Sequence, residues 1–356
     1  MHHVHTLMPT EVAHLYQENI LAADAIPTAR RIIAAVHESA RRRLRALPWL
    51  DARSRALAQA KLSQLRFMIG VRPADVLRAR ARRRTLSVFD TGGLSAFGAH
   101  VVDVRLRSSL DVLAQITVSG VRPAEWARAE GGSTQPFSAL SANAAYVAEQ
   151  NTLFVPAPML QSPIFSPHLP LEHNFGAFGV LVGHEISHGF DERGQQYDAS
   201  GWRVNATTRW TDSVVANFAQ RAQCLAGKYA HFKFMVSRPG QWQVTEGTVS
   251  GRRTLNEDIA DFGGLTLAYS AWLTECGGEC AVPQQHGFFR AFGQVFCGKH
   301  TSENVLKQLN TDVHAPEWVR VNAAVDLFEP FQTAYACLGA AISETRLLPP
   351  SGCVLW

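Results

Sequence analysis

Long hydrophobic runs are missing from this sequence of 356 residues. A membrane-spanning helix needs about 18 or more apolar residues in succession, so we expect no membrane segment in this chain. Met1–Gln17 is rich in histidine and lacks an apolar stretch after a charged start, so we do not interpret it as a signal peptide. Internal repeats and low-complexity tracts are absent too, and the hydrophobic content of 46% is ordinary for a globular protein.

A large excess of charge of one sign is also missing, because the formal net charge is only +4. Arginines nevertheless gather in two places, Arg41–Arg45 and Arg78–Arg84. No aromatic side chains lie between these arginines to stack on bases. We therefore interpret both clusters as solvated helix faces and expect no nucleic-acid partner.

Cysteine is scarce, with six residues in the whole chain. Two of them, Cys276 and Cys280, enclose a three-residue segment. This pair forms either a short disulfide loop or, less favourably, part of a second metal site, since no nearby histidine completes a ligand set.

Hydrophobic spacing predicts helices in the first ninety residues. Apolar residues recur at helical intervals from Ile32 to Leu47. Asp51 is then placed to cap a second helix, which we expect to run through Ile69 and to end at Gly70.

One strand and a further helical region are predicted downstream. Asn151–Val155 is the best strand candidate, and a proline-rich loop after it leads to a helix near 175–190. Because most of the remaining chain also has helical patterns, we expect a mainly α fold with a small β-sheet, in the α+β class.

The segment His184–His188 carries the strongest chemical signal. His184 and His188 are four residues apart, so on a helix both imidazoles face one side and can bind one metal ion. Glu185 projects beside them, where it can take a proton from a metal-bound water. Two imidazoles, an open coordination position and an adjacent carboxylate are what zinc-assisted hydrolysis requires.

A third ligand is available in a second predicted helix. Glu257 can complete a tetrahedral His-His-Glu site, and Asp261, one turn later, can accept the free N–H of a ligand imidazole. Gly263-Gly264 would let this helix pack closely on its neighbour. The alternative for this stretch alone is an amphipathic helix with exposed acids.

Several further motifs accompany the metal motif. In combination they resemble the catalytic half of the neprilysin family of zinc endopeptidases, which includes the endothelin-converting enzymes. The resemblance covers the chain from roughly residue 15 to its end and rests on Asn143–Tyr146, Leu153–Phe165, His184–Asp191, Thr311–Pro316 with Arg320, and Cys353–Trp356.

The resemblance implies a thermolysin-like zincin catalytic domain with one Zn²⁺ per chain. His184, His188 and Glu257 would be the zinc ligands. Glu185 would be the general base, and Asp261 would orient a ligand histidine. On this basis residues 1–137 would form a helical part of the catalytic lobe, and residues 138–356 the zinc-peptidase core with a C-terminal tail.

Other residues would handle the substrate, by the same resemblance. His314 would donate a hydrogen bond to the oxyanion, with Asp312 holding its imidazole protonated. Arg320 would bind a substrate carbonyl, and Asn143 with the Ala144 backbone would hold the peptide extended. An apolar pocket would favour cleavage on the amino side of hydrophobic residues, and its lining would be Met159, Ile164, Val180, Leu181, Val295 and Phe296.

Family members are considerably longer, with a membrane anchor and a second lobe over the cleft. We therefore expect either a truncated chain, with the missing lobe or an oligomer partner supplied separately, or an unusually open cleft. The function expected is zinc-dependent hydrolysis of small peptides. The alternative is a non-catalytic relative that binds zinc or peptides.

The resemblance also implies a location and a set of disulfides. Family members lie at cell surfaces or are secreted, so an extracellular or cell-surface location is expected. Cys224 and Cys353 would form a disulfide. Cys297 and Cys337 occupy positions that the family pairs with cysteines near the N-terminus, and such partners are absent from this chain.

Overall fold

The structure is a computed structural model that describes residues 9–71, 140–237, 244–335, 353 and 355–356. Its chain divides into two compact units. The first comprises Met1–Ala23, Met68–Ala145 and Phe154–Leu160, and the second comprises Asp24–Phe67, Tyr146–Leu153 and Gln161–Trp356. The boundary expected at residues 137 and 138 lies outside the described residues and stays a prediction.

Helices make up most of the described chain, as the hydrophobic spacing predicted. In the first unit, α2 (Pro9–Ile20) packs on the 3-10 turn η2 (Ala157–Leu160). The Val71 N–H donates to Gln17 Oε1 at 2.8 Å and ties the chain back to α2. Within the described ranges, no helix is both long and apolar enough to cross a membrane.

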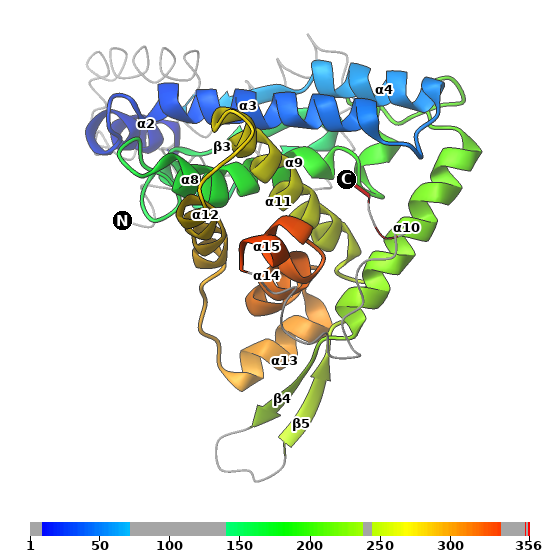
Figure 1. The fold of residues 1–356 in the computed structure, drawn as a ribbon. Coiled ribbons are helices and arrows are strands. Elements are labelled where there is room, and N and C mark those ends of the chain that lie inside the picture. The colour runs from blue at the N-terminus through cyan, green and yellow to red at the C-terminus, as the bar shows by residue number, and fades with distance from the viewer. Residues whose placement is uncertain (1–8, 72–139, 238–243, 336–352, 354) are drawn as a thin grey trace, which may run out of the picture. The chain divides into compact units, whose positions relative to one another are not determined.

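The second unit begins with two antiparallel helices, α3 (Ala25–Ala46) and α4 (Ala52–Ser63). α3 packs on α4 and also lies across α9 and α11, the helices of the metal motif (Figure 1). Its buried stripe includes Ile32, Val36 and Leu44. The predicted cap of α4 is confirmed, because the Asp51 side chain accepts the Ser54 N–H at 2.7 Å.

The prediction that this second helix continues to Ile69 is wrong. Residues Arg66–Ile69 form strand β1 in a three-stranded sheet of order β1-β3-β2, with β2 at Ala145–Val147 and β3 at Thr152–Val155. The Arg66 N–H donates to Asn151 O at 3.0 Å, and the Gly70 N–H donates to Val155 O at 2.8 Å. Pairing with a distant strand therefore overrides the local helical spacing. The strand predicted near 151–155 is confirmed as β3.

The metal motif lies in a continuous helical run made of α8 (Leu171–Asn174), the π-helical turn η3 (Phe175–Gly179) and α9 (Val180–His188). α9 packs along α11 (Leu255–Glu275), as Figure 1 shows. The two backbones touch, because a Cβ on Gly264 would lie 2.5 Å from Val180 O. The close approach expected of the Gly263-Gly264 pair occurs at both residues, because a Cβ on Gly263 would lie 2.2 Å from Ser187 Oγ of α9.

The helical elements of the described chain not yet given bounds are η1 (Ala148–Gln150), η4 (Gly194–Gln196), α10 (Asp212–Ala230), α12 (Val282–Val295), α13 (Ser302–Thr311), α14 (Glu317–Asp326) and α15 (Glu329–Ala334). Helices α10 and α14 pack on α11, and α12 packs on α8 and η3. The Tyr269 ring of α11 stacks on Phe289 of α12 with centroids 5.5 Å apart, and Trp272 stacks on Phe288 at 5.3 Å.

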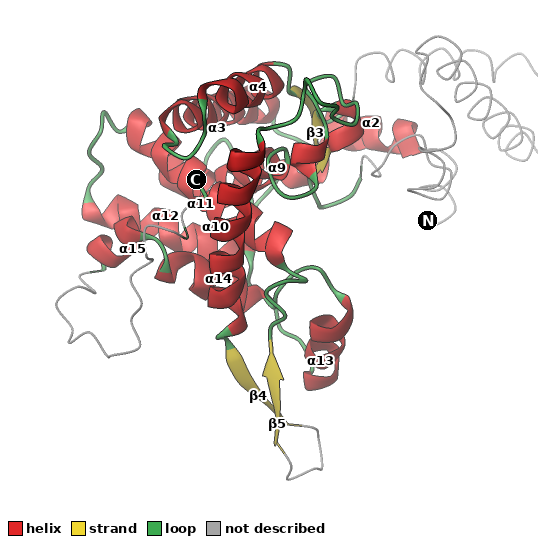
Figure 2. Ribbon diagram, turned by 90° about the vertical axis from the view of Figure 1, so that its right-hand side faces the viewer, coloured by secondary structure: helices red, strands yellow, loops and turns green. Residues whose placement is uncertain are grey.

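An antiparallel strand pair follows α10. β4 (Lys233–Ser237) pairs with β5 (Val244–Thr248), and Lys233 lies opposite Thr248. Figure 2 shows this pair extending beside α13, which it contacts.

Two disulfides connect parts of the described chain. Cys224 of α10 is bonded to Cys353, as the family resemblance implied. Cys276 is bonded to Cys280, so this pair is the short disulfide loop and not a second metal site. Cys297 is an exposed thiol, and Cys337 lies outside the described residues.

Candidate metal and catalytic site

Three potential ligand atoms converge between α9 and α11. His184, His188 and Glu257 each offer one atom, and these atoms all lie within 4.8 Å of one another. The two Nε2 atoms are 3.0 Å apart, and Glu257 Oε2 lies 3.2 Å from His184 Nε2 and 3.6 Å from His188 Nε2. The structure thus brings together the three residues that the sequence predicted as zinc ligands.

A carboxylate holds the far nitrogen of each imidazole. His184 Nδ1 lies 2.9 Å from Asp261 Oδ1, and His188 Nδ1 lies 2.8 Å from Asp191 Oδ2. Such contacts place the proton on Nδ1 and direct the Nε2 lone pair to a metal. Asp191 lies at the end of the motif His184–Asp191, which predicts no role for it. Its position three residues after His188 was the available signal.

Asp191 is itself fixed by the turn that follows α9. Its Oδ1 accepts the N–H groups of Arg193 at 2.8 Å and Gly194 at 2.6 Å. The carboxylate is buried, so its orientation and that of the His188 ring depend on this turn.

Glu185 lies next to the ligands on α9 and is only 8% exposed. Its Oε2 accepts the backbone N–H of Tyr146 in β2 at 2.7 Å. One carboxylate oxygen is thereby held by the strand. Sequence reasoning did not find this contact, because it joins residues far apart in the chain.

His314 reaches the same site from the loop between α13 and α14. Its Nε2 lies 3.1 Å from Glu257 Oε2, and its Nδ1 lies 2.8 Å from Asp312 Oδ1. The contact with Glu257 is the main cause that raises the pKa of His314, and Asp312 adds to it. The imidazole is 41% exposed and so remains open to solvent on one side.

Arg320 of α14 makes a bidentate pair with Asp261. Its Nε and Nη2 donate to the two carboxylate oxygens, both at 2.7 Å. Its guanidinium also lies 4.6 Å from the centre of the Phe296 ring. Arg320 therefore helps to orient Asp261, a contact that the family resemblance did not predict, since it implies only binding of a substrate carbonyl.

The site concentrates ionised carboxylates in a buried place. Burial raises the pKa of Glu257, but the imidazoles of His184, His188 and His314 outweigh it and hold that pKa far below its usual range. Burial also opposes ionisation of Asp261, yet Arg320 and His184 lower its pKa. Both carboxylates are therefore negatively charged, and this charge favours binding of a cation.

The donor set passes a test for metal binding. Among the described residues, no hydrogen bond reaches the buried Glu257 Oε2, although three imidazole nitrogens lie within 3.6 Å of it. The two Nε2 atoms lie 3.0 Å apart and each faces the unpartnered Glu257 Oε2, so the three atoms form one compact donor group. Two nitrogens and one oxygen match the ligand types that zinc prefers.

The predicted substrate-binding residues fall into two groups. Asn143, Ala144 and Met159 belong to the first unit, and their roles remain predictions. In the second unit, Val180 and Phe296 are buried, Val180 against Gly264 and Phe296 beneath Arg320. The other members of this group are half-buried, namely Ile164, Leu181 and Val295.

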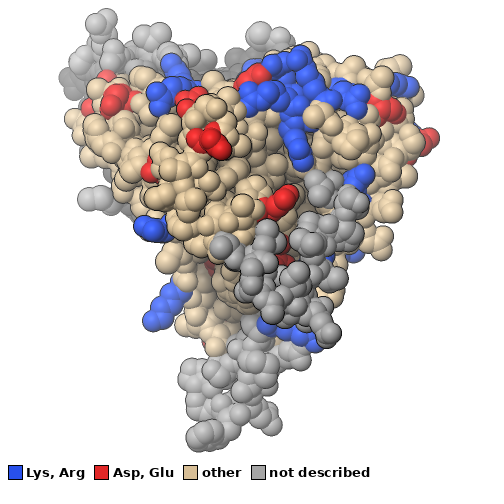
Figure 3. All heavy atoms as spheres, viewed as in Figure 1, with Lys and Arg blue, Asp and Glu red and all other residues tan. Residues whose placement is uncertain are grey.

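The arginine cluster on α3 makes contacts within the protein. Figure 3 shows basic side chains gathered over this helix. Arg41 pairs with Glu38, Arg42 Nη2 donates to Thr274 Oγ1 at 3.0 Å, and Arg43 donates to the carbonyl of Trp356. These contacts give the cluster a structural role. The second cluster, Arg78–Arg84, lies outside the described residues.

Comparison with known proteins points to one family. Two family models, both described as Peptidase family M13, match residues 143–345 and 1–72. Endothelin-converting enzyme-like 1 of Homo sapiens is 33% identical over 322 residues, which cover 88% of this chain and 38% of the relative. Neprilysin-3 of Drosophila melanogaster is 28% identical, over 97% of this chain and 41% of the relative.

Solved structures have the same fold. The zinc metalloprotease Zmp1 of Mycobacterium tuberculosis, in its open state, superposes with a TM-score of 0.71 at 25% identity. That match covers 94% of this chain and 48% of the other. The chain thus spans less than half the length of each of these relatives.

Proposed function

Because the chain belongs to peptidase family M13, we propose that it is a zinc metalloendopeptidase that hydrolyses small peptides. The observation that carries this proposal is the convergence of His184, His188 and Glu257, with Glu185 beside them. The names of the relatives agree with a peptidase, and the solved structures include a zinc metalloprotease.

His184 Nε2, His188 Nε2 and Glu257 Oε2 would hold one zinc ion per chain. When bound, zinc lowers the pKa of a coordinated water toward about 7 and polarises the scissile carbonyl. Asp261 and Asp191 keep the two imidazoles in the tautomer that such binding needs.

Glu185 acts as the general base. Its carboxylate takes a proton from the attacking water and then passes it to the nitrogen of the leaving amine. The Tyr146 N–H occupies Oε2, which leaves Oε1 as the oxygen for this transfer.

His314 donates a hydrogen bond to the oxyanion that forms at the scissile carbonyl. Asp312 accepts from Nδ1 and directs the ring, and its carboxylate favours the protonated imidazole. Removal of such a donor typically raises the barrier by roughly 2.7–4 kcal/mol.

Substrate binding follows the family pattern. Asn143 and the Ala144 backbone hold the peptide extended, and Arg320 contacts a substrate carbonyl through Nη1, because its Nε and Nη2 are engaged with Asp261. Cleavage is proposed on the amino side of a hydrophobic residue. The apolar residues assigned to that pocket are Met159, Ile164, Val180, Leu181, Val295 and Phe296.

The second candidate function is binding of zinc or peptide without cleavage. It requires only the donor group of His184, His188 and Glu257. In that case a separate lobe or an oligomer partner would complete the cleft. For either function we propose an extracellular or cell-surface location, with which the Cys224–Cys353 disulfide agrees.

Cleavage of a quenched fluorescent peptide library by zinc-loaded protein tests the proposal. Glu185→Gln is the matched control, since glutamine keeps an oxygen for the Tyr146 N–H but removes the base. We expect cutting before hydrophobic residues by the wild type, and none by Glu185→Gln or after chelation. Tight binding of one zinc without any cutting would favour the second candidate.

A further inference from the structure

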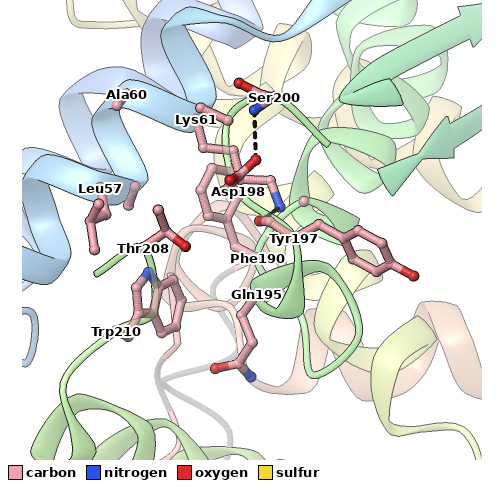
Figure 4. A pocket seen from close by; sticks show the side chains of 13 residues that line it. Leu57, Ala60, Lys61, Phe190, Gln195, Tyr197, Asp198, Ser200, Thr208 and Trp210 are labelled. Atoms are coloured by element: carbon pink, nitrogen blue, oxygen red, sulfur yellow. Dashed lines mark hydrogen bonds between the residues drawn. The ribbon is translucent and has the colours of Figure 1, made fainter. Parts of the chain in front are cut away.

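A lysine is buried behind the metal site. Lys61 of α4 is only 5% exposed. Its Nζ donates to Gly194 O at 2.6 Å and to Tyr197 O at 2.8 Å, both in the segment that follows α9. Figure 4 shows Lys61 reaching from α4 toward Phe190 and Tyr197, at a pocket of about 190 Å³. Burying an amino group is costly unless its hydrogen bonds are made, so this residue type calls for an explanation.

The first arm of Lys61 leads to a zinc ligand. The Gly194 carbonyl that accepts from Nζ belongs to the same residue whose N–H donates to Asp191 Oδ1. Asp191 in turn holds His188 Nδ1. The Nζ therefore fixes the turn that orients one imidazole of the metal site.

A second chain of hydrogen bonds, the second arm, connects Lys61, through Asn151 and Tyr146, to the proposed general base Glu185. Asn151 is buried, and its side-chain amide donates to Lys61 O at 2.9 Å and to Ala199 O at 3.0 Å. The Tyr146 hydroxyl donates to Asn151 Oδ1 at 3.0 Å. Tyr146 is the residue whose backbone N–H holds Glu185.

The packing around Tyr146 strengthens this second arm. Lys61 Nζ lies 5.8 Å from the centre of the Tyr146 ring. A Cβ on Gly189, the residue after His188, would lie 3.6 Å from the ring and its hydroxyl. The ring is thereby confined between α4 and the end of α9, and its backbone with it.

We propose that Lys61 and Asn151 are positioning residues for the hydrolytic site, Lys61 acting on His188 through Gly194 and Asp191, and Asn151 acting on Glu185 through Tyr146. This inference rests on the proposed function. It adds that the two residues have different effects: Lys61 sets the affinity for zinc, and Asn151 sets the turnover rate.

Three variants separate the two arms. Lys61→Met removes the Nζ hydrogen bonds at similar side-chain length, and leaves the Lys61 carbonyl for Asn151. Asn151→Gly removes the amide, and glycine readily adopts the positive φ of 44° found there. Tyr146→Phe deletes only the hydroxyl. Lys299→Met makes the same chemical change as the first variant at an exposed site.

Each arm has a readout besides activity. The zinc dissociation constant from chelator competition and the visible spectrum of the cobalt-loaded protein report on the ligands. The affinity for a simple hydroxamate, measured by calorimetry, reports on Glu185, because the hydroxamate proton needs a carboxylate acceptor there. Thermal unfolding is recorded for every variant.

Lys61→Met should raise the zinc dissociation constant about tenfold, at the lower end of the range expected for losing a direct partner of a ligand, and alter the cobalt spectrum. Asn151→Gly and Tyr146→Phe should lower kcat and hydroxamate affinity about tenfold or more, with KM and zinc affinity near wild type. If Lys61→Met does not fold, the other two variants still test the Glu185 arm.

The results that would overturn the positioning role can be told apart from those that would overturn the proposed function. If Lys61→Met matches Lys299→Met in zinc affinity and spectrum, or if Asn151→Gly keeps wild-type kcat and hydroxamate affinity, the positioning role is overturned. Loss of thermal stability alone would likewise overturn it in favour of a purely structural role. A wild type that binds no zinc would instead refute the proposed function itself.

Discussion

Replacing Gly264 by alanine tests whether direct contact between α9 and α11 holds the proposed zinc ligands together. The added Cβ would lie 2.5 Å from Val180 O and 2.8 Å from His184 N. Both are backbone atoms, so no side-chain rotation relieves the clash. To reach the 3.4 Å of ordinary contact, the helices must separate by roughly 0.9 Å.

Two effects set the expected size of the change. Overpacking costs about 1–3 kcal/mol, and alanine gains about 0.5–1 kcal/mol over glycine inside a helix, so we expect a net loss of about 1–2 kcal/mol. Metal–ligand distances in well-formed sites stay within about 0.2 Å of their standard values, so a displacement of this size would distort the site. Moving His184 away from Glu257 should therefore raise the zinc dissociation constant about tenfold or more.

Gly227 of α10 supplies the matched control, because a Cβ there would meet no atom within 4 Å. Gly227→Ala should stabilise the protein by about 0.5–1 kcal/mol and leave zinc affinity unchanged. Urea unfolding of metal-free protein and chelator competition provide the two measurements. Wild-type zinc affinity in Gly264→Ala would refute the reasoning.

Three further predictions concern the groups around the site. Asp191→Asn turns an amide N–H toward His188 Nδ1 and so favours the tautomer with the proton on Nε2. We therefore expect zinc affinity, measured by chelator competition, to fall about 10–100-fold. An unchanged affinity would contradict this. His314→Ala should lower kcat about 10²–10³-fold at unchanged zinc content, measured by steady-state kinetics and metal analysis, and a normal kcat would remove its oxyanion role. Burial lowers the pKa of Lys61 to about 7, against the opposing effect of Asp191 and Asp198. Above pH 7 the unfolded chain thus binds more protons than the folded protein, so the free energy of unfolding rises with pH. From pH 7.5 to 9 the unfolding free energy of the wild type should increase by about 2 kcal/mol relative to that of Lys61→Met. A difference between the two proteins that does not change with pH would exclude this titration.

The convergence of His184, His188 and Glu257 was the most predictable feature of the candidate site. Residues four apart share a helix face, so the pairing of His184 with His188, and of Glu257 with Asp261, follows from spacing once both stretches are helical. The membership of the neprilysin and endothelin-converting-enzyme family, inferred from the combined motifs, is confirmed by the family matches. The roles of the individual site residues stay predictions.

Contacts between distant segments were not predictable from spacing. The Tyr146 N–H reaches Glu185 only because β2 lies beside α9. Arg66–Ile69 has apolar residues that suit a helix or a strand, and the hydrogen bonds to β3 decide for the strand. Arg320 was expected to meet substrate, and its pairing with Asp261 depends on how α14 packs against α11.

The disulfide between Cys224 and Cys353 encloses a large part of the site within one covalent ring. The two cysteines are 129 residues apart in sequence, and Glu257, His314 and Arg320 all lie between them. A single cut by another protease anywhere in that ring would therefore leave every fragment attached to the rest of the molecule. Under oxidising conditions, a protein nicked in this way would keep Glu257, His314 and Arg320 covalently attached, whereas reduction would free the C-terminal piece, which carries all three when the cut precedes Glu257.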